Sequence, residues 1–444
     1  MTTSKETPWR WVPSIYFGTG TAQAAIATLA LLLYKQLGLS NAEITLYTGL
    51  LFLPWLLRPL WSPFLGLIRT PRWWIVAMQL MLGAALGGVA FTIPTAHWLQ
   101  GTFAFLGLLA FALSIHETEA DVFYHDTVMG STRSGLSSMP NTFRLLAFIF
   151  VQGFLVMVAG NLQLLYRNSI SLSWSLIFYS VAGLFILSWL WHRTSLPSPY
   201  NECLHLLRRQ QRREQFAERW REVKKDIFSF FAQHPRQQLA AVFCFTFCFL
   251  LPETLTSKVA MLFLVDSNHN GGLGLSPQEF GLTYGTVGVV GLIAGSLLCK
   301  AIIAKKGLRV IVLPLSVAIL LPNALYVLLS ETQPTSLGAI NLCIFIGQTS
   351  LGMALVTYWT ALKTISKALG NHTVYIFLTS VMALAQMVPS MFSGALQEWL
   401  GYNNLFLIAL ACGVISLAGC VWIRPMLLNK GNDDVENNKN IDFS

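Results

Sequence analysis

Charged residues are scarce in this chain. Asp, Glu, Lys and Arg make up 11% of its 444 residues, whereas hydrophobic residues make up 54%. Typical soluble domains carry about 25% charged residues, and a water-soluble fold of this length could not bury so much apolar surface. The composition therefore excludes a soluble protein and predicts an integral membrane protein.

Clustered cysteine and histidine are also lacking. The 7 cysteines form no Cys-x-x-Cys pair, and the 8 histidines form no His-Glu-x-x-His motif. We therefore expect packing roles for the cysteines, and neither a metal site nor a cofactor. The N-terminal region has no small-residue cleavage site ahead of its first apolar run, so the first helix itself is expected to direct membrane insertion.

Long apolar runs are abundant. A spanning helix needs about 20 apolar residues, and the sequence accommodates twelve such helices. The predicted spans are 12–34, 44–68, 73–93, 98–127, 139–160, 170–192, 238–265, 277–303, 308–330, 336–362, 372–395 and 402–424. The predicted fold class is an all-α integral membrane protein.

The basic residues are distributed asymmetrically around these spans. With both termini inside, 24 of the 29 Lys and Arg residues fall in cytoplasmic segments and only Lys35 and Arg167 fall in outer loops. Lysine and arginine are retained on the cytoplasmic side, so this asymmetry predicts cytoplasmic termini. The net charge of +9 then reflects topology and does not indicate a nucleic-acid partner.

A short segment occurs twice. Residues 37–44 (LGLSNAEI) and 273–280 (LGLSPQEF) each follow one apolar run and open the next. In both copies a serine precedes a glutamate by three residues, which is the spacing of a helix capping box. Repetition of a hydrophobic unit is typical of secondary transporters. The alternative is that two helices merely begin alike.

The repeat divides the chain into two pseudo-symmetric halves. We expect a six-helix bundle over 1–192, a basic amphipathic cytoplasmic linker over 193–236, a second six-helix bundle over 237–424 and a disordered cytoplasmic tail over 425–444. Within the linker, apolar residues recur three or four apart, so a surface helix is expected whose basic face meets anionic headgroups. The alternative is a simple spacer between the bundles.

Arg58 lies inside the second predicted span. Pro54, Pro59 and Pro63 surround it, and because proline lacks a backbone N–H, this helix should bend or break. A charge at mid-bilayer costs roughly 2.5 to 3.5 kcal/mol, which makes Arg58 a functional candidate. It could form an anion site, or it could pair with an acid on a neighbouring helix.

The fourth span ends in a run of acids. At 100° per residue, Glu117, Asp121 and His125 form one stripe, whereas Glu119 and Asp126 form another on roughly the opposite side. One stripe is expected to line a central cavity and the other to pair with Arg144 of the fifth span. Alternatively, part of this run lies at the membrane interface.

The seventh span carries Glu253 and Lys258, about 140° apart around a regular helix, so they are not expected to form a local ion pair. A desolvated carboxylate can exchange a proton near neutral pH, as a proton-driven carrier requires. Glu253 and Asp121 are the main proton-coupling candidates, or else they are permanently paired structural charges. Gln23, Gln348 and Tyr375 add polar groups that could bind a sugar or peptide.

Several of these motifs resemble the AmpG-like muropeptide permeases of the major facilitator superfamily. The resemblance covers roughly residues 9–424. The motifs are LWSP at 60–63, the acid-rich end of the fourth span, FRL at 143–145, LPE at 251–253 with Lys258, GGLGLS at 271–276, Gln348 with Gly352, MAL at 382–384, and Ser393 with Gly394.

The resemblance implies a bacterial inner-membrane protein that imports acidic cell-wall glycopeptides together with protons and has no enzymatic activity. The expected partners are the solute, protons and membrane lipids, and the expected state is a monomer. It also implies that Arg58, Asp121, Arg144, Glu253 and Lys258 form the polar lining. Together with the polar residues noted above, we expect substrate contacts by Arg58, Arg144 and Lys258, with Gln23, Gln348 and Tyr375, and proton coupling by Asp121 and Glu253, with Glu117, Glu119 and Asp126.

The sequence also departs from the family pattern. Gly66 and Leu67 stand where relatives carry an acid after Trp-Ser-Pro, and residues 20–22 read Gly-Thr-Ala instead of Gly-Leu-Pro. A siderophore permease of the same superfamily is the nearest alternative. Two further alternatives are a membrane enzyme that uses His116, Glu119, His125 and Asp126, and a sensor that has lost transport.

Overall fold

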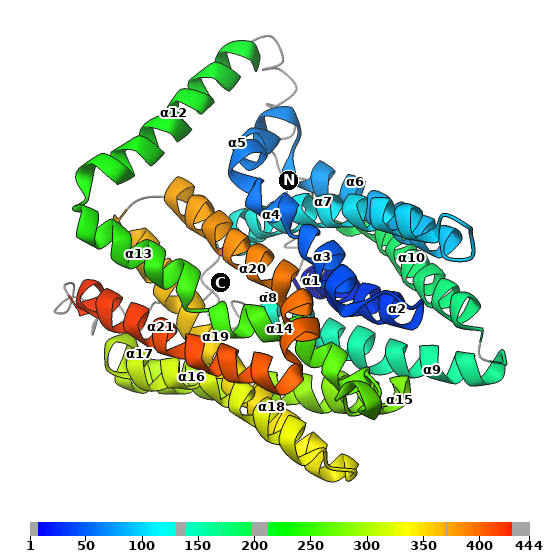
Figure 1. The fold of residues 1–444 in the computed structure, drawn as a ribbon. Helices are drawn as coiled ribbons and strands as arrows, with labels where there is room; N and C mark the ends of the chain where they lie inside the picture. The colour runs from blue at the N-terminus through cyan, green and yellow to red at the C-terminus, as the bar shows by residue number, and fades with distance from the viewer. Residues whose placement is uncertain (1–7, 130–138, 168, 198–211, 370–371, 429–444) are drawn as a thin grey trace.

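The computed structural model describes residues 8–129, 139–167, 169–197, 212–369 and 372–428. Over these residues the fold is all-helical, as predicted. Eleven helices are long and apolar enough to cross a membrane, and there are twelve when one bent pair counts as a single span. Figure 1 shows two groups of helices side by side, α1–α10 and α13–α21, with α12 along one edge, where it contacts α5 of the first group and α20 of the second.

The N-terminal half contains six spans. The first consists of α1 (Val12–Ala24), a π-helical turn η2 (Ala25–Leu29) and α2 (Ala30–Gln36). The second consists of α3 (Asn41–Leu50), α4 (Leu53–Leu56) and α5 (Arg58–Ile68). The other four are α6 (Pro71–Thr92), α7 (Trp98–Tyr124) with η3 (His125–Met129), α8 (Met139–Phe148) with η4 (Ile149–Leu155) and α9 (Val156–Leu165), and α10 (Ile170–Ser195).

The C-terminal half follows α12 (Arg212–Gln233) and repeats this plan. Its spans are α13 (Arg236–Cys248) with α14 (Leu251–Val265), α15 (Pro277–Phe280) with η7 (Gly281–Gly288) and α16 (Val289–Lys306), α17 (Leu308–Val317) with α18 (Leu320–Thr332), α19 (Leu337–Leu369), α20 (His372–Leu400) and α21 (Tyr402–Leu428).

Proline determines the shape of the second span. The axis bends by 51° where α3 and α4 give way to α5 at Arg58. Pro54 and Pro59 occupy the first turns of α4 and α5, where their missing N–H groups are tolerated. The predicted break in this helix is confirmed.

Both predicted capping boxes are present. Ser40 caps α3 by accepting from the Glu43 N–H, while the Glu43 carboxylate accepts from the Ser40 N–H at 3.0 Å. Ser276 and Glu279 make the same pair of bonds at α15, where the second measures 2.9 Å. These boxes satisfy backbone donors at the membrane boundary, where an unsatisfied amide would be costly.

Over the described residues, the two halves share a buried apolar core at one end and not at the other. We call it the Asp266 end; there, one buried apolar cluster includes Leu29 and Leu33 of the N-terminal half and Leu262 and Phe263 of the C-terminal half. At the other, the Arg144 end, each half keeps a separate cluster. Trp11, Tyr16 and Phe123 belong to the N-terminal one, and Leu239, Phe245 and Ile423 belong to the C-terminal one.

Small residues allow close packing between the halves. A Cβ atom added at Gly285 of η7 would overlap the backbone of Gln152 in η4, and one added at Gly394 of α20 would overlap the Asn41 carbonyl of α3. Glycine permits such close backbone approach between membrane helices. Both contacts hold the N-terminal half against the C-terminal half.

Candidate functional site

A polar network joins the two halves at the Asp266 end. The Lys35 ammonium donates to Asp266 Oδ2 at 3.0 Å and to Asn41 Oδ1 at 2.9 Å. The Tyr402 hydroxyl donates to Asp266 Oδ2 at 2.9 Å, and the Asn41 amide donates to Gln397 Oε1 at 2.7 Å. We call these five residues the Asp266 network. Lys35 and Asn41 belong to the N-terminal half, so the network crosses between halves.

Asp266 follows the last residue of α14, outside the apolar spans, and its side chain is 7% exposed. Burial alone would raise the pKa of Asp266, but hydrogen bonds from Lys35, Asn270 and Tyr402, together with the charge of Lys35, lower it below its usual value. The ionised form of Asp266 is thus the form that the network stabilises.

A second charged group lies toward the Arg144 end. Arg144 Nη2 of α8 is 3.3 Å from Asp121 Oδ1 and 3.5 Å from Glu117 Oε1, both on α7. The Gln23 amide and the Trp55 indole donate to the two Glu117 oxygens at 2.8 and 2.9 Å. We call these five residues the Arg144 cluster. The predicted Glu117 and Asp121 stripe is therefore the one that pairs with Arg144.

The Arg144 cluster is accessible to solvent. The Asp121 side chain is 51% exposed, and that of Arg144 is 21% exposed. The Tyr16 hydroxyl also donates to Asp121 Oδ1 at 3.1 Å, and the Arg144 guanidinium lies 5.2 Å from the Tyr16 ring centroid. The charged groups of the Arg144 cluster are thus paired with one another and partly exposed.

The C-terminal half contributes groups to the same region. Tyr375 of α20 and Lys363 of α19 lie within electrostatic range of Asp121. The Ser380 hydroxyl of α20 donates to the Trp55 carbonyl at 3.4 Å. The Arg144 cluster therefore faces the C-terminal half across the interface between halves.

The second acidic stripe lies elsewhere. Glu119 is 4% exposed and lies within electrostatic range of Arg58 and Asp126. Arg58 thus has an acid nearby on another helix, in line with the alternative that Arg58 pairs with a neighbouring acid. The Nε atom of Arg58 is nevertheless buried without a hydrogen bond. The side chain of Asp126 is 70% exposed and lies 3.8 Å from His125.

Among the described residues, Glu253 and Lys258 form no ion pair with one another. Glu253 is half-buried, and no described residue donates a hydrogen bond to its carboxylate. It lies within electrostatic range of Tyr284 and Tyr326, and Gln348 lies close to both tyrosines. The prediction that Glu253 and Lys258 form no local pair is confirmed.

His116 belongs to a buried chain that sequence spacing did not reveal. Gln79 of α6 lies 3.3 Å from His116 Nε2 and 2.8 Å from His192 Nδ1, while Ser14 lies 2.8 Å from His192 Nε2. Both histidines are fully buried. This chain ties α1, α6, α7 and α10 together, and His116 faces Gln79.

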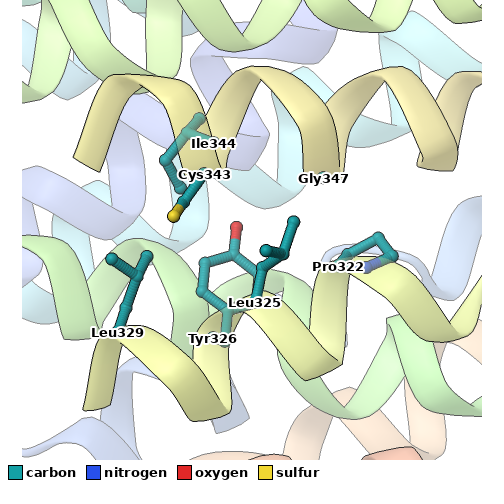
Figure 2. A pocket seen from close by; sticks show the side chains of 7 residues that line it. All are labelled: Pro322, Leu325, Tyr326, Leu329, Cys343, Ile344 and Gly347. Carbon is teal, nitrogen blue, oxygen red and sulfur yellow. The ribbon is translucent and has the colours of Figure 1, made fainter. Parts of the chain in front are cut away.

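Metal ligands do not gather in the part of the chain that the structure describes, since no three His, Cys, Asp or Glu side chains lie close enough to hold an ion. An apolar pocket lies between α18 and α19, where Tyr326 points from α18 toward α19 (Figure 2). Its lining residues are Pro322, Leu325, Tyr326, Leu329, Cys343, Ile344 and Gly347. None of these lining residues is charged, and none belongs to the Arg144 cluster.

No protein-family model matches the chain. Among solved structures, the nucleoside transporter NupG is 14% identical, with 93% of this chain and 98% of that chain covered and a TM-score of 0.68. A bacterial homolog of the human lysosomal transporter Spinster, in an inward-facing and occupied conformation, is 15% identical, with 95% and 97% covered and a TM-score of 0.68.

A structure from a study of proton dependent oligopeptide transporters is 15% identical, with 95% of this chain and 100% of that chain covered and a TM-score of 0.66. The helices of this chain therefore follow those of known transporters over nearly their full length. The AmpG-like branch stays a prediction from sequence motifs. The chain has the fold of the major facilitator superfamily, an all-α membrane architecture of two six-helix halves.

Proposed function

We propose that this protein is a proton-coupled secondary transporter that imports an anionic glycopeptide, of the anhydromuropeptide kind, across the bacterial inner membrane by alternating access. The observation that carries the proposal is the one-sided closure of the halves. They share a core and the Asp266 network at one end, and keep separate cores at the other.

Alternating access requires two bundles that rock about a site between them. The Arg144 cluster lies at that interface, on the side where the cores are separate. The excess of Lys and Arg in the segments at this end favours a cytoplasmic orientation for it, so the conformation described here would be inward-facing.

Solute contacts are proposed for Arg58, Arg144, Lys258, Gln23, Gln348 and Tyr375. Two of these support a polar solute directly, since Gln348 lies beside two tyrosines and Tyr375 lies near Asp121. The neighbours named above are transporters, one from a study of proton dependent oligopeptide transporters, and this favours carriage of a peptide-bearing solute over an enzymatic role.

Proton coupling is proposed for Glu253 and Asp121, with Glu117, Glu119 and Asp126 as further carboxylates. Glu253 is the strongest candidate because it is half-buried among apolar helices, while no described side chain bonds to its oxygens. A carboxylate without a fixed partner is free to bind and release a proton as the halves move. A D-xylose-proton symporter shares the fold at 13% identity, 93% and 95% coverage and a TM-score of 0.64.

Uptake by proteoliposomes tests the proposal. The purified protein is reconstituted, and entry of labelled anhydromuropeptide is measured with and without an inward proton gradient. We expect the gradient to drive accumulation, Glu253→Gln to abolish the gradient effect, and the matched surface variant Glu218→Gln on α12 to behave like wild type. Equal uptake with and without the gradient would contradict proton coupling.

The same vesicles are tested with a ferric siderophore. Gradient-driven entry of the siderophore, without entry of the glycopeptide, would assign the protein to the alternative substrate class.

A further inference from the structure

Lys258 of α14 is a buried cation without a protein partner. The residue is 6% exposed, and its ammonium group donates no hydrogen bond to any described side chain or backbone group. No Asp or Glu within those ranges lies within 4.0 Å of it. A buried ammonium is strongly unfavourable unless it is paired, so Lys258 is poised for a negative group from outside the protein.

Arg144 differs from Lys258 in this respect. Its Nη2 atom is shared by Asp121 and Glu117, at 3.3 and 3.5 Å, and its guanidinium also lies over the Tyr16 ring. The Arg144 cluster thus holds two carboxylates for one guanidinium. Arg144 already has two carboxylate partners, whereas Lys258 has none, so Arg144 is not the natural partner of an anionic solute.

The surroundings of Lys258 belong to the interface between halves. Its ammonium lies 5.6 Å from the ring centroid of Phe52, which stands between α3 and α4 in the N-terminal half. Pro54 has no N–H to bond the carbonyl of Leu50, so a polar backbone group is also released at this break. Phe52 pairs with Trp55 at 6.0 Å, and Trp55 donates to Glu117.

These contacts link Lys258 to the Arg144 cluster through two aromatic rings. A solute between the halves would therefore find an unpaired cation and a ring face near Phe52, and an acid-rich polar surface near Glu117. The first position offers an unpaired cation and the second a cation that already has two acidic partners, so a solute that is negative at one end should place that end at Lys258.

We propose that, among the cations proposed above to contact the solute, Lys258 is the one that binds its carboxylate, whereas Arg144 positions Glu117 and Asp121 for polar contacts with the same solute. The ligand class is a carboxylate whose neighbouring apolar surface packs on the Phe52 ring. This inference rests on the proposed function, because it assigns the charged end of the same solute to one residue.

A matched pair of ligands tests the assignment. The probe is an anhydromuramyl disaccharide bearing a single alanine, used once with the free carboxylate and once as the carboxamide. Binding of both to the purified full-length protein is measured by isothermal titration calorimetry. We expect wild type to bind the carboxylate about 10- to 100-fold more tightly, as expected for loss of a charge-assisted hydrogen bond.

Three variants separate the possible roles. Lys258→Met should bind both ligands equally, Lys258→Arg should retain most of the preference, and Arg144→Gln should weaken transport while keeping the preference. Lys35, whose ion pair with Asp266 joins the halves, gives the control, because Lys35→Met should leave the ratio of the affinities for the carboxylate and carboxamide ligands unchanged. Monodispersity and melting temperature establish that each variant is folded.

The outcomes are distinguishable. A carboxylate preference that survives in Lys258→Met, or is lost in Arg144→Gln alone, would overturn the assignment while leaving the proposed function standing. Binding of neither ligand by wild type would overturn the proposed glycopeptide substrate and this assignment together. Loss of the carboxylate preference in Lys258→Met alone would support the assignment of the carboxylate to Lys258.

Discussion

The contact between Lys35 and Asp266 gives the sharpest prediction about how the halves move. Asp266→Asn removes the charge but keeps the shape of the side chain. The pair is partly buried, with side-chain exposures of 21% and 7%, so its contribution should lie between those of exposed and buried pairs, at about 2 kcal/mol. Because 1.4 kcal/mol corresponds to a tenfold change in an equilibrium constant, the substitution should raise the equilibrium constant for separation of the halves at the Asp266 end about 30-fold.

Distances between spin labels report this separation. Labels are placed at exposed Thr95 in the N-terminal half and exposed Thr335 in the C-terminal half, after replacement of the native cysteines. In nanodiscs, Asp266→Asn should add or enlarge a long-distance population. Glu331→Gln is the matched control, because its partner Asn403 lies in the same half. Identical distance distributions for wild type and Asp266→Asn would refute a latching role for the Asp266 network.

Four further predictions follow from single residues. Arg144→Ala should cripple solute flux without abolishing membrane insertion, because two carboxylates lose their partner; uptake and membrane yield measure this, and wild-type uptake would remove Arg144 from the site. Lys258→Met should raise the melting temperature in detergent, because it removes an unpaired buried charge; a lower melting temperature would contradict the absence of a structural partner. Gly285→Val should destabilise the contact between halves by about 1 to 3 kcal/mol, seen as a lower melting temperature, because its Cβ would overlap the Gln152 backbone. The Asp266 pKa is lower in the folded protein than in the unfolded chain, so the stabilising contribution of Asp266 should be complete above about pH 4 and be lost as the pH falls through that lowered pKa. The spin-label distances at stepped pH check this expectation. Separation of the halves at the Asp266 end near pH 7 would contradict it.

The fold could be predicted from the sequence because each of its signals is local. Span positions follow from apolar runs, the bend at Arg58 follows from Pro54 and Pro59, and the helix starts follow from two capping boxes. Each signal spans only a few residues or one helix. Tertiary packing therefore did not need to be known.

Part of the candidate site was predictable for the same reason. Glu117 and Asp121 are four residues apart on one helix face, and both meet Arg144. Because the acids of this part of the sequence gather at the end of the fourth span, they were the obvious candidate partners of Arg144. Which acidic stripe faces Arg144 depends on how α7 is rotated against α8, and helix rotation is set by packing across the whole bundle.

The Asp266 network could not be predicted. Lys35 and Asp266 are separated by 231 residues, and Asn41 and Gln397 by 356, so no spacing indicates their contact. Each lies at a span end, where polar residues are ordinary. Likewise, the Gln79 link between His116 and His192 joins three separate helices and leaves no local pattern.

Side-specific labelling at the Arg144 end tests whether the protein works by alternating access. A single cysteine replaces Asp121, whose side chain is 51% exposed, and a membrane-impermeant maleimide is applied to oriented vesicles from either face. We expect labelling from the cytoplasmic face, and a shift toward the outer face when Asp266→Asn is added. Labelling from the outer face alone, or no shift on breaking the Asp266 network, would contradict it.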